Sequence, residues 1–104
     1  MQSFAVNFLY LSPAVLTDPA WAHLGRFLHP GSRDKENQAL ILGRHLDLSW
    51  HPYLSFQAMD WESKGTRKVL IRHDIVASIL EVSSHTNQLG FVDLSAVREQ
   101  LKDQ

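Results

Sequence analysis

The sequence predicts an α+β fold: a curled antiparallel sheet of about five strands, one helix near residues 18–28 and a short C-terminal helix near residues 94–102. The strongest observation is the stretch from Leu46 to Ala58, where apolar and polar side chains alternate without a break. A period of two is typical of extended chain with one buried face. In both predicted helices, apolar residues recur at helical spacing. A length of 104 residues, 44% of them hydrophobic and 20% charged, fits a single globular domain over residues 1–104.

The N-terminal part is expected to contain a strand followed by a helix. Phe4–Leu11 is short and aromatic, which favours a buried strand, and Pro13 ends it. Asp18 can cap the helix, and Pro19 suits its first position because the missing N–H is not needed there. The inner face of this helix would carry Trp21, Leu24 and Leu28.

The C-terminal half is expected to supply further strands and the closing helix. Residues 75–82 are ambiguous, because Asp74 could cap a helix there whereas the β-branched residues favour a strand. Asp93 can cap the closing helix. The other elements, in chain order, are a charged loop (Ser32–Asn37), a strand (Ala39–Leu42), a turn (Asp60–Thr66), a strand (Lys68–Arg72), a polar turn (Ser84–Gly90) and the closing helix (Leu94–Lys102).

The alternating stretch is too long to run straight. From His45 to Ala58 a straight strand would extend roughly 45 Å, whereas a domain of this size is about 35 Å across. The stretch therefore either bends sharply at Pro52 or folds back as a hairpin. A hairpin with the loop His51-Pro52-Tyr53 keeps the apolar side chains on one face. Its facing pairs would be Trp50 with Leu54, Leu48 with Phe56, Leu46 with Ala58, Ser49 with Ser55, Asp47 with Gln57, His45 with Met59, Arg44 with Asp60 and Gly43 with Trp61.

Composition excludes several classes of protein. The chain has no cysteine, which excludes disulfides, thiolate metal sites and cysteine nucleophiles. Ten Lys and Arg against eleven Asp and Glu give a net charge of −1, without the basic excess typical of nucleic-acid or membrane-surface binders. The apolar N-terminus lacks the preceding positive charge of a signal peptide, since the first basic residue is Arg26, and no apolar run is long enough for a membrane span. We expect a soluble cytoplasmic protein that does not associate with membranes.

Two residues on the polar face of the alternating stretch suggest catalysis. His45 and Asp47 are two positions apart, which separates their Cβ atoms by roughly 6.5–7 Å in extended chain. A carboxylate at that distance can orient an imidazole for general-base chemistry, as in a small hydrolase or isomerase. No nucleophile stands at a recognisable spacing, so the simpler interpretation is two solvated polar residues.

Metal binding is not indicated, although the chain contains six histidines. None of them forms the paired spacings that are typical of zinc sites, and no HExxH motif occurs. We therefore expect no metal and no cofactor. The histidines are His23, His29, His45, His51, His73 and His85.

Basic and aromatic residues offer a possible surface for single-stranded nucleic acid. Small β-barrels bind single strands with such a face, by stacking bases on aromatic rings and holding phosphates with cations. The balanced net charge and the neighbouring acids Asp60 and Glu62 argue against it. The candidate residues are Tyr53, Trp61, Arg44, Arg67, Lys68, Arg72 and His73.

Protein interaction is the remaining class. The chain is rich in the aromatic residues that anchor interfaces, with three Trp, five Phe and two Tyr. Trp50 is predicted to lie in the core, whereas Trp61 either is exposed as a partner surface or covers Gly43 within the chain. Edge strands of the sheet would also permit pairing between copies.

The run Lys68–Val82 resembles the closing strands of Sm-like small barrels, because a strand, a tight turn and a short β-branched strand follow one another. The resemblance covers about fifteen residues and lacks the glycine-containing turn of that motif. It implies a small barrel as an alternative form of the sheet and no site residues.

The sequence favours a small non-enzymatic binding or oligomerisation module. A coherent core and interface aromatics are visible, and no catalytic constellation is. The first alternative is a small β-barrel that binds single-stranded nucleic acid, and the second is a hydrolase or isomerase that uses His45 and Asp47.

Overall fold

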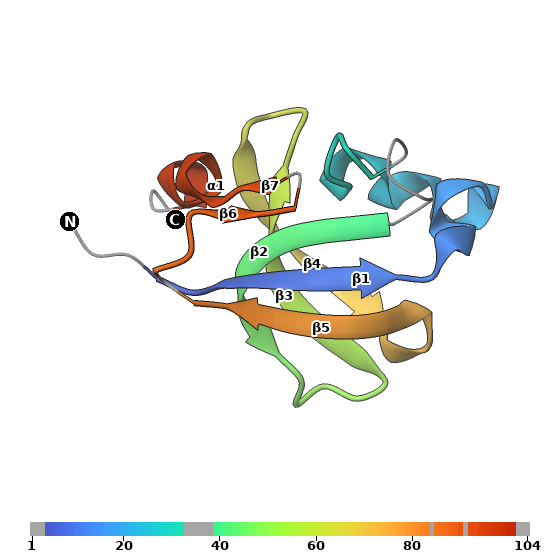
Figure 1. The fold of residues 1–104 in the computed structure, drawn as a ribbon. Coiled ribbons are helices and arrows are strands. Elements are labelled where there is room, and N and C mark those ends of the chain that lie inside the picture. The colour runs from blue at the N-terminus through green and yellow to red at the C-terminus, as the bar shows by residue number, and fades with distance from the viewer. Residues whose placement is uncertain (1–3, 33–38, 84, 91, 102–104) are drawn as a thin grey trace.

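A computed structural model describes residues 4–32, 39–83, 85–90 and 92–101 of the chain. Its main feature is one antiparallel sheet of five strands in the order β4-β3-β2-β1-β5, which curls strongly (Figure 1). The order leaves β4 and β5 unpaired with each other, so the sheet is not closed into a barrel. The predicted α+β class is confirmed. The strands are β1 (Val6–Leu11), β2 (Ala39–Asp47), β3 (Tyr53–Asp60), β4 (Gly65–Arg72) and β5 (Val76–Val82).

The helical elements lie at two ends of the sheet (Figure 1). Where a helix was predicted near residues 18–28, the chain forms a 3-10 helix, and the side chain of Asp18 accepts a hydrogen bond from the Ala20 N–H at 3.0 Å as a cap. Asp93 caps the C-terminal helix in the same way, through the Ser95 N–H at 3.0 Å. The remaining elements are η1 (Pro13–Leu16), η2 (Pro19–Phe27), η3 (His73–Ile75), β6 (Gln88–Leu89), β7 (Val92–Asp93) and α1 (Leu94–Leu101).

Residues 75–82 form a strand rather than a helix. Ile75 ends the short η3 turn, and β5 then pairs antiparallel with β1 from Val82 opposite Val6 to Val76 opposite Leu11. The β-branched side chains therefore decide the structure of this segment.

Of the charged loop predicted at residues 32–37, only Ser32 belongs to the described residues.

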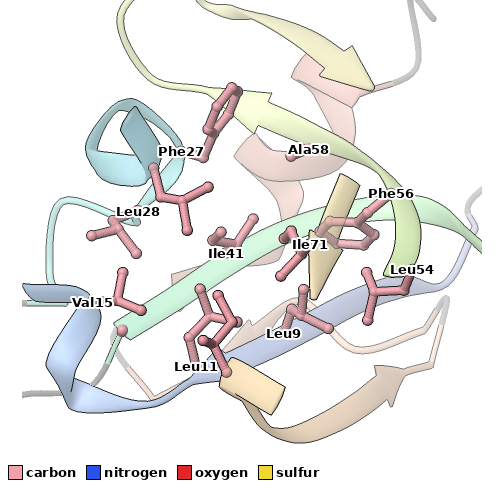
Figure 2. Packing of buried hydrophobic residues seen from close by; sticks show 13 residues of the cluster. Leu9, Leu11, Val15, Phe27, Leu28, Ile41, Leu54, Phe56, Ala58 and Ile71 are labelled. Atoms are coloured by element: carbon pink, nitrogen blue, oxygen red, sulfur yellow. The ribbon is translucent and has the colours of Figure 1, made fainter. Parts of the chain in front are cut away.

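The sheet has a hydrophobic cluster on each of its faces. The first lies under η1 and η2, where side chains from four strands converge (Figure 2). The second lies under α1. Successive residues of β1 and β2 alternate between the two clusters, so these central strands are buried on both faces. The first cluster includes Leu9, Ile41, Leu54, Phe56 and Ile71, and the second Phe8, Leu40, Leu42, Met59, Leu94, Val97 and Leu101.

The alternating stretch folds back as a hairpin and does not continue as one bent strand. Its predicted register is wrong, however, because residues 48–52 separate β2 from β3 where three loop residues were expected. A bulge between Arg44 and Asp47 adds one residue to β2, and His45 adopts a positive φ of 58° there. The observed pairs are Gly43 with Ala58, Arg44 with Gln57 and Asp47 with Ser55, which replace the predicted ones.

The bulge also changes which face the side chains of β2 occupy. Before it, Leu40 and Leu42 belong to the second cluster, whereas Leu46 after it packs against the first. A strand without a bulge would place all three on one face. The even-numbered positions of Leu54, Phe56 and Ala58 do share one buried face, as the alternation predicts.

Gly43 is required by close packing against β3. A Cβ at this position would lie 2.2 Å from the carbonyl oxygen of Gln57 and 2.9 Å from the ring of Phe56. Phe56 therefore covers this glycine, and the predicted pair of Gly43 with Trp61 is wrong.

Two charged residues of the described part of the chain are buried, Asp60 on the face of β3 that η2 covers and Arg98 in α1. The carboxylate of Asp60 has no exposed surface and accepts hydrogen bonds from Arg26 at 2.7 Å and from Arg67 at 3.0 Å. The Arg26 guanidinium is the main reason that the pKa of Asp60 lies far below its usual range. Arg98 donates to the backbone carbonyls of Phe4, Thr86 and Ser83 at 2.5–2.8 Å, which ties α1 to the start of the chain.

Candidate binding surface

The outer face of β3 and β4 presents three rows of side chains that α1 does not cover. In an antiparallel sheet, facing residues project on the same side. Tyr53 faces Arg72 in the first row. The second row runs across three strands with Asp47, Ser55 and Leu70, and the third with Arg44, Gln57 and Lys68.

A hollow of about 490 Å³ lies on this face. This volume is in the range of small-ligand pockets. Two large apolar side chains beside it are mostly in solvent, since Trp50 is 64% and Leu70 is 61% exposed. Tyr53 is 41% exposed, and Leu48 from the same loop as Trp50 is 50% exposed. The lining residues are Trp50, Tyr53, Ser55, Lys68 and Leu70.

The loop at residues 48–52 holds Trp50 in place over the hollow. Asp47 Oδ1 accepts hydrogen bonds from the backbone N–H and the hydroxyl of Ser49 at 2.9 and 2.6 Å. Its Oδ2 accepts a hydrogen bond from the indole N–H of Trp50 at 3.2 Å. The Trp50 carbonyl then accepts the Tyr53 N–H at 2.9 Å, which closes the loop. The predicted core position of Trp50 is wrong, because five loop residues carry it out of the strand pairing.

The hydrogen bonds of Asp47 also stabilise its charged form. The Ser49 hydroxyl contributes most to a lowered pKa of this carboxyl, with smaller contributions from the Ser49 N–H, the Trp50 indole and the charge of Lys68. Both carboxylate oxygens thus accept hydrogen bonds from the loop. The structure describes no catalytic arrangement for His45, which lies at the bulge, and the catalytic role of this pair stays a prediction.

Basic side chains surround the hollow. Lys68 lines it, and the Arg72 guanidinium lies 5.6 Å from the centre of the Tyr53 ring. The interaction with Tyr53 and the charge of Asp74 raise the pKa of Arg72. Arg44, in the row of Lys68, lies 3.9 Å from the ring of Phe4. The fold therefore places Tyr53, Lys68, Arg72 and Arg44 from the predicted residues on one face of the sheet.

Three further predicted residues lie differently, of which Arg67 pairs with the buried Asp60. His73 follows Arg72 at the end of β4, and its ring meets that of His51 edge-on at 5.0 Å. Trp61 is half-buried against the second cluster, where its ring meets that of His29 edge-on at 5.0 Å. Burial of the His29 ring lowers the pKa of this histidine. Trp61 is thus neither fully exposed nor placed over Gly43.

Sequence reasoning did not identify Trp50 and Leu70 as surface residues. Their signal was present but ambiguous, since Leu70 stands between Val69 and Ile71 in a run that alternation does not explain. A run of consecutive apolar residues indicates burial on both faces. In this strand Ile71 is buried and Leu70 is exposed. Leu70, the apolar residue on the outer face of β4, was therefore the available indication of an exposed apolar surface.

Comparison of the chain with protein-family models, with curated proteins and with solved structures found no match. The described residues contain no helix that is long and apolar enough to cross a membrane. They also contain no group of three or more His, Asp or Glu side chains that could hold a metal ion. The geometry of the hollow is thus the basis for a functional hypothesis.

Proposed function

We propose that this protein is a non-enzymatic binding module whose hollow holds an apolar side chain of a partner segment that also carries carboxylates. The observation that carries the proposal is the exposure of Trp50 and Leu70 on one hollow of the sheet. Clustered large apolar side chains on a protein surface are typical of interaction sites. Tryptophan, tyrosine and arginine are also the residues that contribute most to binding energy in interfaces.

The charges around the hollow favour an acidic partner. Lys68 lines the hollow, and Arg44 lies in the same row of side chains as Lys68. Arg72 lies in the row of Tyr53. The carboxylate of Asp47 accepts hydrogen bonds from the loop, and Asp74 pairs with Arg72 at 3.4 Å. Carboxylates on a partner segment would complement these cations and increase the association rate.

The aromatic side chains of the hollow are held before any partner arrives. Trp50 is tied to Asp47 through its indole N–H, and Tyr53 stacks near the Arg72 guanidinium. Side chains that are already ordered lose less conformational entropy on binding. We expect a small, transient interface with a dissociation constant of about 10–100 µM.

Fluorescence polarisation with a labelled peptide tests the proposal. The probe is a peptide of about ten residues with central phenylalanines flanked by glutamates. The wild-type protein is expected to bind it, and Trp50→Ala and Leu70→Ser are expected to weaken binding at least about tenfold. Leu80→Ser, which changes a comparably exposed leucine on β5, is the matched control and should bind as the wild type does. Equal binding by Leu70→Ser and wild type would contradict the proposed site.

A second candidate is single-stranded nucleic acid, because Trp50 and Tyr53 are exposed aromatics beside Lys68 and Arg72. Such platforms stack bases and bind phosphates, and the binding weakens steeply with salt. A labelled oligothymidine of about 15 nucleotides, titrated at about 50 and 200 mM salt, distinguishes the two. Salt-dependent binding of the oligonucleotide without peptide binding would favour this candidate. If neither probe binds, the hollow is not a site for either ligand.

A further inference from the structure

The outer edge of β5 is the second exposed apolar feature of the molecule. β5 pairs with β1 on one side and ends the strand order of the described sheet on the other. Five consecutive residues, Ala77 to Glu81, are exposed along it. Their outward backbone N–H and C=O groups therefore face no strand of the described residues, which makes this edge a template for another strand.

The side chains of β5 would suit a strand pair that continues the sheet. Ile79 is 39% and Leu80 is 43% exposed, and they project to opposite faces. Ile79 faces Leu9 of the first cluster, and Leu80 faces Phe8 of the second. A strand added at this edge would extend both hydrophobic faces at once.

The two edge strands of the described sheet differ in charge. The edge strand β4 carries Arg67, Lys68 and Arg72, and basic residues of this kind protect an edge against pairing. In β5 the only charged residue is Glu81. Two copies that meet through β4 would repel each other, whereas two β5 edges present mainly uncharged residues.

We propose that two copies of this chain pair through β5, antiparallel, about a two-fold axis at Ile79. The partner is thus a second copy, and this surface is separate from the hollow of the proposed function. Ile79 is the middle of the exposed stretch, so this centre pairs all five residues. The facing pairs are Ile79 with Ile79, Ser78 with Leu80 and Ala77 with Glu81, each from the two copies.

The position of Glu81 supports this register. With the axis at Ile79, the two Glu81 residues are offset by four positions, or about 13 Å along the strands. This distance exceeds the Debye length of about 8 Å at physiological salt, so their repulsion is largely screened. An axis at Leu80 would reduce the offset to about 7 Å, within the Debye length.

The paired edge is small. Five residues a side bury much less than the roughly 800 Å² per partner of a standard stable interface. We therefore expect a reversible dimer with a dissociation constant of about 100 µM. Two-fold pairing is closed, so association stops at the dimer.

Sedimentation equilibrium of the full chain from about 10 µM to 1 mM tests the proposal. The wild type is expected to change from monomer to dimer over this range. Ile79→Lys should stay monomeric, with its folding checked by circular dichroism, and Leu70→Lys, an exposed leucine of the hollow, should dimerise as the wild type does. A monomeric wild type at 1 mM, a dimeric Ile79→Lys or a monomeric Leu70→Lys would each overturn it.

The register has its own test, because the chain contains no cysteine. Facing residues of an antiparallel pair have Cα atoms about 4.5–5.5 Å apart, within the range that a disulfide spans. With oxidised glutathione as the oxidant, which accepts the two electrons and two protons of the thiols, Ile79→Cys should form a covalent dimer. Ala77→Cys, about 13 Å from its copy, should not. Equal cross-linking of both variants, or assemblies larger than a dimer, would contradict the two-fold pairing.

Discussion

The outer surface of the sheet has two halves that contain similar apolar residues and differ in what covers them. One half carries Leu42 and Met59, and both are buried under α1. The other half carries Trp50 and Leu70 and stays open around the hollow. An apolar side chain contributes to folding only as far as its surface leaves water. The covered half therefore stabilises the protein, and the open half is available to a partner.

The largest expected effect comes from the buried carboxylate of Asp60, which lies on the face of β3 opposite to Met59. Asp60→Ala would leave Arg26 and Arg67 without their shared partner and remove the acceptor for the Glu62 N–H, which Asp60 Oδ1 binds at 3.0 Å. Loss of one member of such a network is strongly destabilising. We expect the Tm to fall by about 20 °C or more in scanning calorimetry. Asp74→Ala, which removes an exposed carboxylate paired at 3.4 Å, is the control and should change it little.

The same carboxyl predicts the acid sensitivity of the fold. Its pKa is lower in the folded than in the unfolded state, so its contribution is fully present above the unfolded value of about 4 and is lost as the pH falls. The free energy of unfolding should decrease progressively below about pH 5. Urea titrations at pH 7, 4 and 3 measure this, and Asp60→Asn should show a shallower decrease. A parallel decrease in wild type and variant would assign the effect to other groups.

Leucine truncation compares the two halves directly. Leu42→Ala removes a side chain with no exposed surface and should destabilise the fold by about 3 kcal/mol in urea unfolding. Leu70→Ala removes a side chain that is mostly in solvent and should change the free energy of unfolding by less than about 0.5 kcal/mol. If the two truncations had similar effects, the hollow would be covered in solution.

A smaller effect is expected from the hairpin that joins the halves. Gly43→Ala would place a methyl group 2.2 Å from the Gln57 carbonyl oxygen, and the strands would have to separate. We expect a loss of about 2 kcal/mol in chemical denaturation. Gly25→Ala, whose Cβ would meet nothing within 4 Å, is the control and should be nearly neutral. A neutral Gly43→Ala would show that β2 and β3 approach less closely.

Most elements of the fold could be predicted because their signals are local. Asp18 and Asp93 cap the helical segments that follow them, and the β-branched residues of β5 indicate a strand. The hairpin register could not be predicted, because it depends on a bulge at which the non-glycine residue His45 takes a positive φ. No residue type between Arg44 and Asp47 indicates an extra residue in the strand.

The candidate site was harder to predict because exposure is a property of the whole fold. Leu42 and Leu70 are the same residue type in predicted strands, and only the position of α1 distinguishes them. The network of Asp60 was missed for a similar reason, since Arg26 lies 34 residues away in the chain. Of the predicted residues, Tyr53 and Lys68 line the hollow, and Arg44 and Arg72 lie on the same face, because β2, β3 and β4 are neighbours in the sheet.

The three backbone hydrogen bonds of Arg98 have a consequence for the order of events during translation. Every strand of the main sheet leaves the ribosome before α1, so Leu40 and Leu42 are synthesised long before their cover. Arg98 then contacts Phe4, a residue 94 positions earlier. Until that late contact forms, Leu40 and Leu42 lack the cover of α1, and exposed apolar surface of this kind is what chaperones bind on a folding chain. Before α1 packs, the nascent chain therefore exposes apolar surface that the folded protein buries.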